Sequence, residues 1–218
     1  QKHLHGTAYA IQACVAVYRV TANDEALDLA LAGFSFMDRN AHDERYGGYL
    51  SLQPLMPGEQ DNIGTPAGWK DINVHSDLFE SFMELGSVSG DPTVRARLHE
   101  ILDILLTVFA EGDGNYFYLP DWKPASLYVR YGNMLQTGAR LLDARDLHED
   151  PERVTNAASR LIATALNSGW DTQYGGVWYG ATINPENNTK QLERDKQWWV
   201  QFEALKAARL LAAFKPEY

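Results

Sequence analysis

The sequence predicts an all-α protein built from consecutive helical hairpins, and three observations carry this prediction. Apolar residues recur mostly at the three- and four-residue intervals of an α-helix. Helix-start signals, namely Asn23, Asp91-Pro92 and Asp150-Pro151, stand directly before three of these segments. No alternating run of β-branched residues is long enough for a large sheet.

Seven helices are expected along the chain, and each follows from the apolar spacing and the start signals. Their ranges are 4–20, 24–39, 70–88, 92–109, 131–145, 151–167 and 191–214. An irregular stretch over 40–68 contains Tyr46-Gly47-Gly48-Tyr49, and a second Gly-Gly turn lies at 174–177. Glycine pairs at turns supply positive φ angles. A short strand is expected at 114–118.

The order helix, helix, aromatic turn repeats along the chain. The turns begin near Tyr46, Asn115 and Tyr174, which are 69 and 59 residues apart. Spacings of this size indicate an array of supersecondary units. One hairpin cannot bury its apolar face alone, so neighbouring hairpins must stack. No linker interrupts the pattern, and we expect a single domain over residues 1–218.

Composition excludes several classes of protein. The formal net charge is −10, which argues against nucleic acid or an anionic membrane as a partner. The single cysteine, Cys14, excludes a disulfide framework. No apolar run approaches the ~20 residues that span a bilayer, and the first residues lack a signal pattern. We therefore expect a cytoplasmic protein. Exposed flanks of an incomplete array would favour a homo-oligomer.

Four segments of the chain match short patterns that occur together in one family of proteins. The family patterns are Tyr-Gly-His-Ala-Phe-Ala, Lys-x-x-Asn-x-His, Tyr-Gly-His-x-x-Glu and Lys-x-Trp-Trp-x-Gln-x-Glu-Ala. The matching stretches, in the same order, are residues 5–10, 70–75, 131–136 and 196–204. They resemble the N-acylglucosamine 2-epimerase family, which includes cellobiose 2-epimerases and mannose-type aldose–ketose isomerases. The resemblance implies an (α/α)6 toroid of twelve helices, of which seven would form an incomplete ring.

The chemistry that this resemblance implies is proton transfer at C2 of a reducing mono- or disaccharide. A proton next to a carbonyl is weakly acidic, so its removal needs a positioned base and donors for the enediolate oxygen. In the family two histidines share this work, and no metal or redox cofactor is required. Here Asn133 and Gln136 replace the first histidine and its glutamate partner, and no histidine follows His148. The two-histidine mechanism cannot be assembled from these residues alone.

The resemblance still implies a set of site residues. The catalytic candidates are His75, Asn133 and Gln136, and the substrate-binding candidates are Asn73, Trp199, Glu203, Trp122 and Thr7. His75 would contact the sugar near C1 and C2, Trp199 would stack on its ring and Glu203 would bind its hydroxyls. Trp122 lies in a turn that could face the cleft, and Thr7 replaces a family histidine. The expected ligand is a small carbohydrate.

Structural interpretations stand beside these functional ones. His75 could be a core histidine that donates to a backbone carbonyl. Asn133 and Gln136 are three apart on one helix face and could bond to each other. Trp198 and Trp199 point ~100° apart on a helix, so one should be core while Trp199 reaches the cleft.

The other histidines are expected to be unimportant for the site. His3 and His5 would form a frayed chain end. His42, His99 and His148 would lie on the solvent side.

Two further functions remain open from the sequence. The replacements at Asn133 and Gln136 suggest a carbohydrate-binding relative without catalysis. An (α/α)6 glycoside hydrolase is the other alternative, and it would need two carboxylates ~5–9.5 Å apart. Asp71, Asp77 and Glu203 are the candidate acids for that chemistry.

Overall fold

The computed structural model describes residues 2–53, 65–112, 114–187 and 189–215, leaving aside the side chains of 2, 3, 52 and 53. Contacts divide the chain into two compact units. The first comprises residues 1–104 with 117–125, and the second comprises 105–116 with 126–218. The expectation of a single domain stays a prediction.

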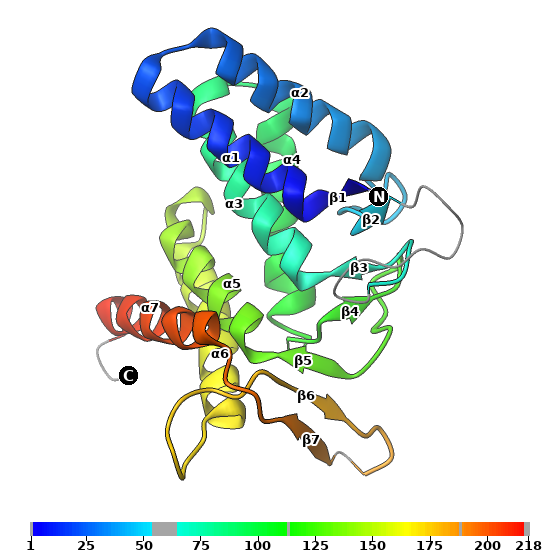
Figure 1. Ribbon diagram of the computed structural model, residues 1–218, viewed down its shortest axis with the longest axis vertical. Coiled ribbons are helices and arrows are strands. Elements are labelled where there is room, and N and C mark those ends of the chain that lie inside the picture. Colours follow the sequence, from blue (N-terminus) through cyan, green and yellow to red (C-terminus); the bar gives the residue numbers. More distant parts are fainter. Residues whose placement is uncertain (1, 54–64, 113, 188, 216–218) are drawn as a thin grey trace. The chain divides into compact units, whose positions relative to one another are not determined.

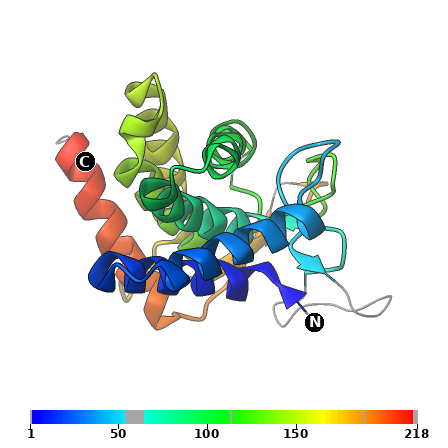
Figure 2. The ribbon, with the colours of Figure 1, turned by 90° about the horizontal axis from the view of Figure 1, so that it is seen from above.

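In its described residues, the first unit has four helices and short strand pairs (Figure 1). Its elements are β1 (Lys2–His3), α1 (Leu4–Thr21), α2 (Asp24–Ala41), β2 (Leu52–Gln53), β3 (Lys70–Asp71), α3 (Ile72–Ser89), α4 (Pro92–Ile104) and β4 (Phe117–Tyr118). Strands β1 and β2 pair antiparallel, as do β3 and β4. Helix α1 packs against both α2 and α3, and α3 packs against α4. Figure 2 shows α1 and α2 side by side from a second direction.

Local capping explains where these helices begin. The Asn23 side chain accepts a hydrogen bond from the Glu25 N–H at 3.0 Å, and the Asp91 carboxylate accepts from the Thr93 N–H at 2.7 Å. Each cap pairs a main-chain donor that a helix start leaves without a partner. The expected helix starts at 24 and 92 are therefore confirmed. Inside the unit, the Phe34 and Phe82 rings meet edge to face with centroids 5.0 Å apart.

The described part of the second unit has three α-helices and a small sheet. Its elements are the π-helical turn η1 (Leu105–Phe109), β5 (Tyr128–Arg130), α5 (Tyr131–Asp143), the 3₁₀ turn η2 (Arg145–Leu147), α6 (Pro151–Gly169), β6 (Gly180–Ile183), β7 (Lys190–Glu193) and α7 (Trp198–Phe214). Helix α5 packs against α6 and α7. The approach is close, because a Cβ on Gly138 would lie 2.6 Å from Ile162 and one on Gly132 would lie 2.5 Å from Trp199.

Two expected helices differ in extent from the structure. The last helix begins at Trp198 and not near 191, because residues 190–193 form β7 and pair antiparallel with β6. The fourth helix ends as α-helix at Ile104, and residues 105–109 continue with π-helical hydrogen bonding. The strand expected at 114–118 is reduced to β4 and a bridge between Asn115 and Val129. No helix in the described ranges is both long enough and apolar enough to cross a membrane.

Candidate functional site

A tight turn over residues 43–49 lies against two of the candidate residues of the first unit, His75 and Trp122. The Asp43 carboxylate accepts hydrogen bonds from the N–H groups of Arg45 and Tyr46 at 3.0 and 3.2 Å. The N–H of Asp43 donates to the Gly48 carbonyl, and that of Gly47 donates to the Asp43 carbonyl, both at 2.8 Å. Gly47 and Gly48 have φ angles of 70° and 73°, which glycine adopts without steric cost.

Lys70, at the start of β3, ties this turn to two other segments. Its side chain is 0% exposed, and its Nζ donates to Asp43 Oδ2, the Gly47 carbonyl and the Pro120 carbonyl at 2.8, 2.6 and 2.7 Å. The ammonium also lies 4.4 Å from the centre of the Trp122 ring. Burial lowers the pKa of Lys70, and the Asp43 carboxylate opposes that shift. The buried charge is stable there because all three of its donors are bonded.

His75 lies in the first turn of α3 and is completely buried. Its Nδ1 is 2.8 Å from the Asp71 carbonyl, and its Nε2 accepts the Tyr49 N–H at 3.0 Å. This pairing places the proton on Nδ1. Burial lowers the pKa of His75 to about 4, although the Asp71 carbonyl acts in the opposite direction. The imidazole is therefore neutral near pH 7 and held by main-chain groups on both sides.

The Trp122 ring packs against His75 and Gly48. Its ring meets the His75 ring edge to face with centroids 5.1 Å apart, and its Nε1–H donates to the Tyr46 carbonyl at 2.7 Å. Its φ angle is 64°, which is uncommon for a residue with a side chain. A Cβ on Gly48 would lie 2.5 Å from the Trp122 ring and 2.7 Å from His75 Nε2. The close packing therefore requires glycine at position 48.

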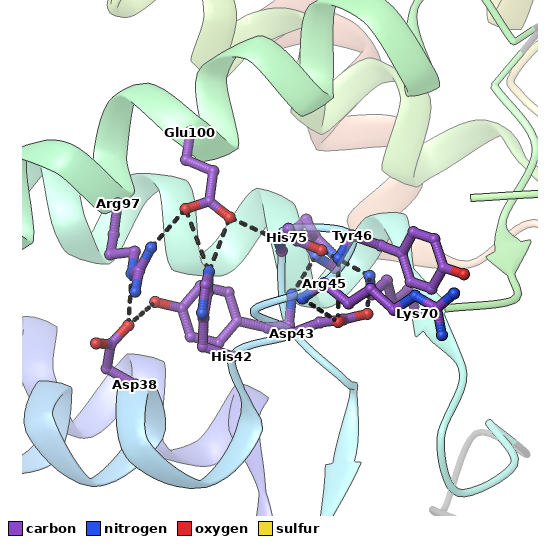
Figure 3. A network of polar contacts seen from close by, with 12 residues as sticks. Asp38, His42, Asp43, Arg45, Tyr46, Lys70, His75, Arg97 and Glu100 are labelled. Atoms are coloured by element: carbon purple, nitrogen blue, oxygen red, sulfur yellow. Dashed lines mark hydrogen bonds and ion pairs between the residues drawn. The ribbon is translucent and has the colours of Figure 1, made fainter. Parts of the chain in front are cut away.

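A chain of charged groups supports the turn from α2 and α4 (Figure 3). The Glu100 carboxylate accepts from the Gly48 N–H at 2.7 Å and lies 2.9 Å from His42 Nε2. Arg97 donates to Glu100 and to Asp38 at 2.8 and 2.7 Å. Burial raises the pKa of Glu100, but these hydrogen bonds outweigh it and the net shift is downward. The expectation that His42 faces solvent is wrong, because its side chain is 6% exposed and pairs with Glu100.

The second unit repeats this turn over residues 171–177. The Asp171 carboxylate accepts from the N–H groups of Gln173 and Tyr174 at 3.0 and 3.2 Å. Gly175 and Gly176 have φ angles of 72° and 84°. The main-chain hydrogen bonds that close the two turns also correspond, at 2.8 and 2.9 Å here.

The groups that hold the second turn correspond as well. Lys196 Nζ donates to Asp171 Oδ2 at 2.5 Å and lies 4.6 Å from the centre of the Trp178 ring. Gln201 Oε1 accepts the Val177 N–H at 2.8 Å, as His75 accepts that of Tyr49. Lys70 and His75 are five residues apart, and so are Lys196 and Gln201. The two units thus share one scaffold, with an imidazole in the first and an amide in the second.

The predicted site residues of the second unit lie on α5 and α7. Asn133 is buried in the first turn of α5, and the Gln136 amide donates to Glu203 Oε1 at 3.2 Å. The sequence leaves open a bond between Asn133 and Gln136, and the structure pairs Gln136 with α7. Trp199 packs its ring over Gly132 and meets the Tyr179 ring edge to face at 6.4 Å.

Trp198 differs from expectation. The expectation that Trp198 is the core member of the pair, with Trp199 reaching the cleft, is wrong for Trp198, because it is 73% exposed and its ring contacts Phe202. Helix α7 buries the stripe that begins at Val200 and continues through Ala204 and Ala207. A residue two positions before Val200 points about 200° away from it and falls outside that stripe.

The predicted residues of the first unit lie on α1, on α3 and in the loop after β4. Thr7 is half-buried in the first turn of α1, and Asn73 is half-buried in the first turn of α3. His5 belongs to α1, and its Nδ1 contacts the carboxylate of Asp77 on α3. The expectation of a frayed end is wrong for His5 because it takes no account of the packing of α1 on α3. The side chain of His3 is outside the described residues.

Sequence reasoning assigned no role to the basic residues that precede the helices. Lys70 and Lys196 stand two residues before α3 and α7, and Arg130 stands directly before α5. Arg130 lies 4.4 Å from the centre of the Tyr116 ring and donates to the hydroxyls of Tyr116 and Tyr128, both at 3.2 Å. A basic residue near the same place before each of these helices was a signal available in the sequence.

The next question is whether the described residues could bind a metal ion. No group of three or more His, Cys, Asp or Glu residues there is arranged to hold a metal ion. The expectation that the reaction needs no metal or cofactor stays a prediction.

Comparison with solved structures identifies the class of fold. The fold resembles those of a cellobiose 2-epimerase from Bacillus thermoamylovorans B4167 (TM-score 0.82, 19% identity, 99% of this chain, 56% of that chain) and a D-mannose isomerase (0.79, 20%, 99%, 55%). A family 76 glycoside hydrolase from a bovine Bacteroides thetaiotaomicron strain is also similar (0.76, 12%, 99%, 45%). These likenesses confirm the expected (α/α)6 type of fold.

Sequence comparison narrows the class to a family. The family model for N-acylglucosamine 2-epimerase (GlcNAc 2-epimerase) matches residues 53–217, so the chain belongs to that family. A curated cellobiose 2-epimerase from Ruminococcus albus is 25% identical over 210 residues, which cover 94% of this chain and 52% of that protein. The chain therefore spans about half the length of this relative.

Proposed function

We propose that this chain acts on the reducing end of a mono- or disaccharide as a 2-epimerase or aldose–ketose isomerase, by proton transfer through an enediolate. The family match over residues 53–217 carries the proposal. It includes three of the four segments that resemble the family, at 70–75, 131–136 and 196–204. Because the chain spans about half of its relatives, the activity of the whole protein is part of the proposal.

The proposed roles follow from the chemistry of each side chain. Trp122 and Trp199 offer aromatic faces, and an apolar sugar face stacks on such rings. Asn73, Thr7 and Glu203 offer amide, hydroxyl and carboxylate groups for sugar hydroxyls.

The three catalytic candidates have more restricted roles. We propose that His75 acts as a neutral imidazole, since its nitrogens are bonded to main-chain groups and burial lowers its pKa to about 4. Asn133 and Gln136 would orient the substrate, since amides do not titrate near neutral pH.

The test is exchange of solvent deuterium into C2 of the sugar. Mannose, glucose and cellobiose would be incubated with the protein in deuterium oxide and followed by proton NMR. The proposal expects the C2 proton signal to fall in at least one sugar, because an enediolate returns a solvent-derived proton. Binding of a sugar without any loss of that signal would contradict it.

One observation favours a second candidate, a carbohydrate-binding relative without catalysis. The Gln136 amide donates a hydrogen bond to Glu203. Gln136 stands where the family has the glutamate partner of its histidine. An amide–carboxylate contact is thus found where the family has a titratable histidine–glutamate pair. Titration calorimetry would then show sugar binding while deuterium exchange stays absent. Introducing Asn133→His together with Gln136→Glu would test whether the replacement of that pair is the cause.

The glycoside hydrolase alternative has less support. Asp71 caps α3 by accepting the Val74 N–H at 2.8 Å, and Asp77 contacts His5. Both carboxylates are buried and engaged, whereas hydrolysis needs two that face the glycosidic bond. The expected cytoplasmic location and homo-oligomer stay predictions.

A further inference from the structure

The proposed reaction needs a base, and the position where the family carries its first histidine holds Asn133. We propose that His5 on α1, oriented by Asp77 on α3, is the base that removes the C2 proton. This inference rests on the proposed function and names a catalytic residue for it. Both residues lie within the first unit.

The geometry of the pair supports this role. His5 is in the first turn of α1 and its side chain is 36% exposed, while the Asp77 side chain is 0% exposed. Nδ1 of His5 contacts Oδ2 of Asp77. The Tyr9 ring, one turn further along α1, meets the imidazole edge to face with centroids 4.7 Å apart. The imidazole is thus held from two sides and is still accessible to solvent.

A carboxylate on one ring nitrogen prepares the other nitrogen for proton transfer. It fixes the tautomer with the proton on Nδ1, so Nε2 is the basic atom, and it stabilises the imidazolium that forms. The same logic orients histidine in serine hydrolases, where the carboxylate itself does not take the proton. Asp77 is therefore a positioning residue, and His5 would touch the reacting proton.

The internal repeat supports the location. Asp77 lies seven residues after Lys70, and Glu203 lies seven residues after Lys196, so the shared scaffold gives both units a carboxylate at one place. In the second unit a non-titrating amide, that of Gln136, meets this carboxylate. In the first unit an imidazole meets it. Thr7 and Asn73, two predicted sugar-binding residues, lie on the same two helices within one turn or so of the pair.

The other histidines whose side chains the structure describes are worse candidates. His75 is buried between main-chain groups, and His42 is 6% exposed and bonded to Glu100. His99 is exposed on α4, and His148 contacts the main chain of Asp150 beyond α5. Among these side chains, His5 is the one that combines solvent access with a buried carboxylate.

The protons and electrons of the step balance without a cofactor. Nε2 of His5 takes the C2 proton of the open-chain aldose. The electron pair of that C–H bond becomes the C1–C2 double bond, and the carbonyl π electrons move to O1. The imidazolium then returns its proton and neutral His5 is regenerated. At C1 this gives the ketose, with the O2–H proton moving to O1. At C2 it gives the epimer once the enediolate has turned about the C2–C3 bond, so that its other face meets His5.

The test measures deuterium exchange at sugar C2 for the wild type, His5→Gln, Asp77→Asn and the control His99→Gln. The glutamine side chain at position 5 keeps an N–H donor for Asp77 but cannot act as a base. We expect exchange to fall at least ~100-fold in His5→Gln, in line with loss of a general base, and to stay within about twofold in His99→Gln. Exchange in His5→Gln within about tenfold of wild type would overturn the inference. No exchange by the wild type would instead overturn the proposed function, and this inference with it.

A second measurement does not depend on turnover, and its wild-type part does not depend on the folding of a variant. Nitrogen-15 NMR of the wild-type imidazoles reports which ring nitrogen of His5 carries the proton. We expect the Nδ1–H form, a shift of the Nε2 resonance on adding the exchanging sugar, and loss of the tautomer preference in Asp77→Asn. An Nε2–H form, or an Nε2 resonance that does not respond to saturating sugar, would overturn the inference.

Discussion

Replacing Lys70 by methionine tests whether the buried ammonium holds the first unit together. Methionine keeps much of the side-chain volume but removes three hydrogen bonds of 2.6 to 2.8 Å and the charge over the Trp122 ring. It also leaves the Asp43 carboxylate without its counter-charge. Breaking a buried ion pair by removing one partner costs about 3–5 kcal/mol. We expect a loss of that size in the free energy of unfolding.

The internal repeat supplies a matched control. Lys196 makes the corresponding ion pair with Asp171, but its side chain is 30% exposed. Lys196→Met should therefore cost about 1–2 kcal/mol, near the lower range for hydrogen bonds to charged groups. The difference between the two variants measures the burial of Lys70 together with its two hydrogen bonds to main-chain carbonyls.

Urea unfolding followed by circular dichroism measures both variants. With a slope of about 2 kcal/mol/M, Lys70→Met should lower the midpoint by about 2 M and Lys196→Met by less than about 1 M. A midpoint change below about 0.5 M for Lys70→Met, or an equal change in both variants, would refute the reasoning.

Three further predictions follow from the turn, from His75 and from Trp199. Gly48→Ala should lower the free energy of unfolding by at least ~3 kcal/mol, because its Cβ would meet Trp122 and His75 within 2.7 Å. Gly90→Ala should lower it by only ~1–2 kcal/mol, the cost of a left-handed backbone, because Gly90 has a φ of 65° and open space around it. Since burial lowers the pKa of His75 to about 4, the unfolded chain binds its proton first, and stability should fall as pH drops from about 6.5 towards 4, by on the order of 3 kcal/mol. His75→Gln, which copies Gln201, should remove most of that pH dependence while staying folded at neutral pH. Trp199→Ala should weaken sugar binding at least ~5-fold in titration calorimetry through lost stacking.

A specific experimental result would contradict each of these three predictions. Equal unfolding free energies for the two glycine variants would show that the packing around position 48 gives way. An unchanged pH profile in His75→Gln would assign the acid sensitivity to another group. Sugar binding by Trp199→Ala with wild-type affinity would remove the indole from the site.

Local signals in the sequence predicted the helices well. Asn23 and Asp91 cap helix starts through contacts with residues two positions away, so the information lies within a few residues. Strand β7 was missed because its pairing with β6 depends on a hairpin partner and its own residues, Lys190–Glu193, resemble an extension of the following helix.

The site was harder to predict, because its contacts join distant segments. The Gly-Gly turns could be recognised from their residues, yet the acceptors of Lys70 come from Asp43, Gly47 and Pro120, which lie 23 to 50 residues away. The contact of His5 with Asp77 likewise depends on the packing of α1 against α3. Neither pairing leaves a periodic trace in the sequence.

The corresponding turns of the two units differ in the side chain that accepts a main-chain hydrogen bond, and this difference bears on how the chain unfolds in acid. The acceptor behind Tyr49 is an imidazole and the one behind Val177 is an amide, so a proton can disable the first acceptor and not the second. In mild acid, amide hydrogens around Tyr49 should therefore exchange with solvent sooner than those around Val177. The turn at residues 43–49 would then open before the turn at residues 171–177, because the first has His75 as its acceptor and the second has Gln201.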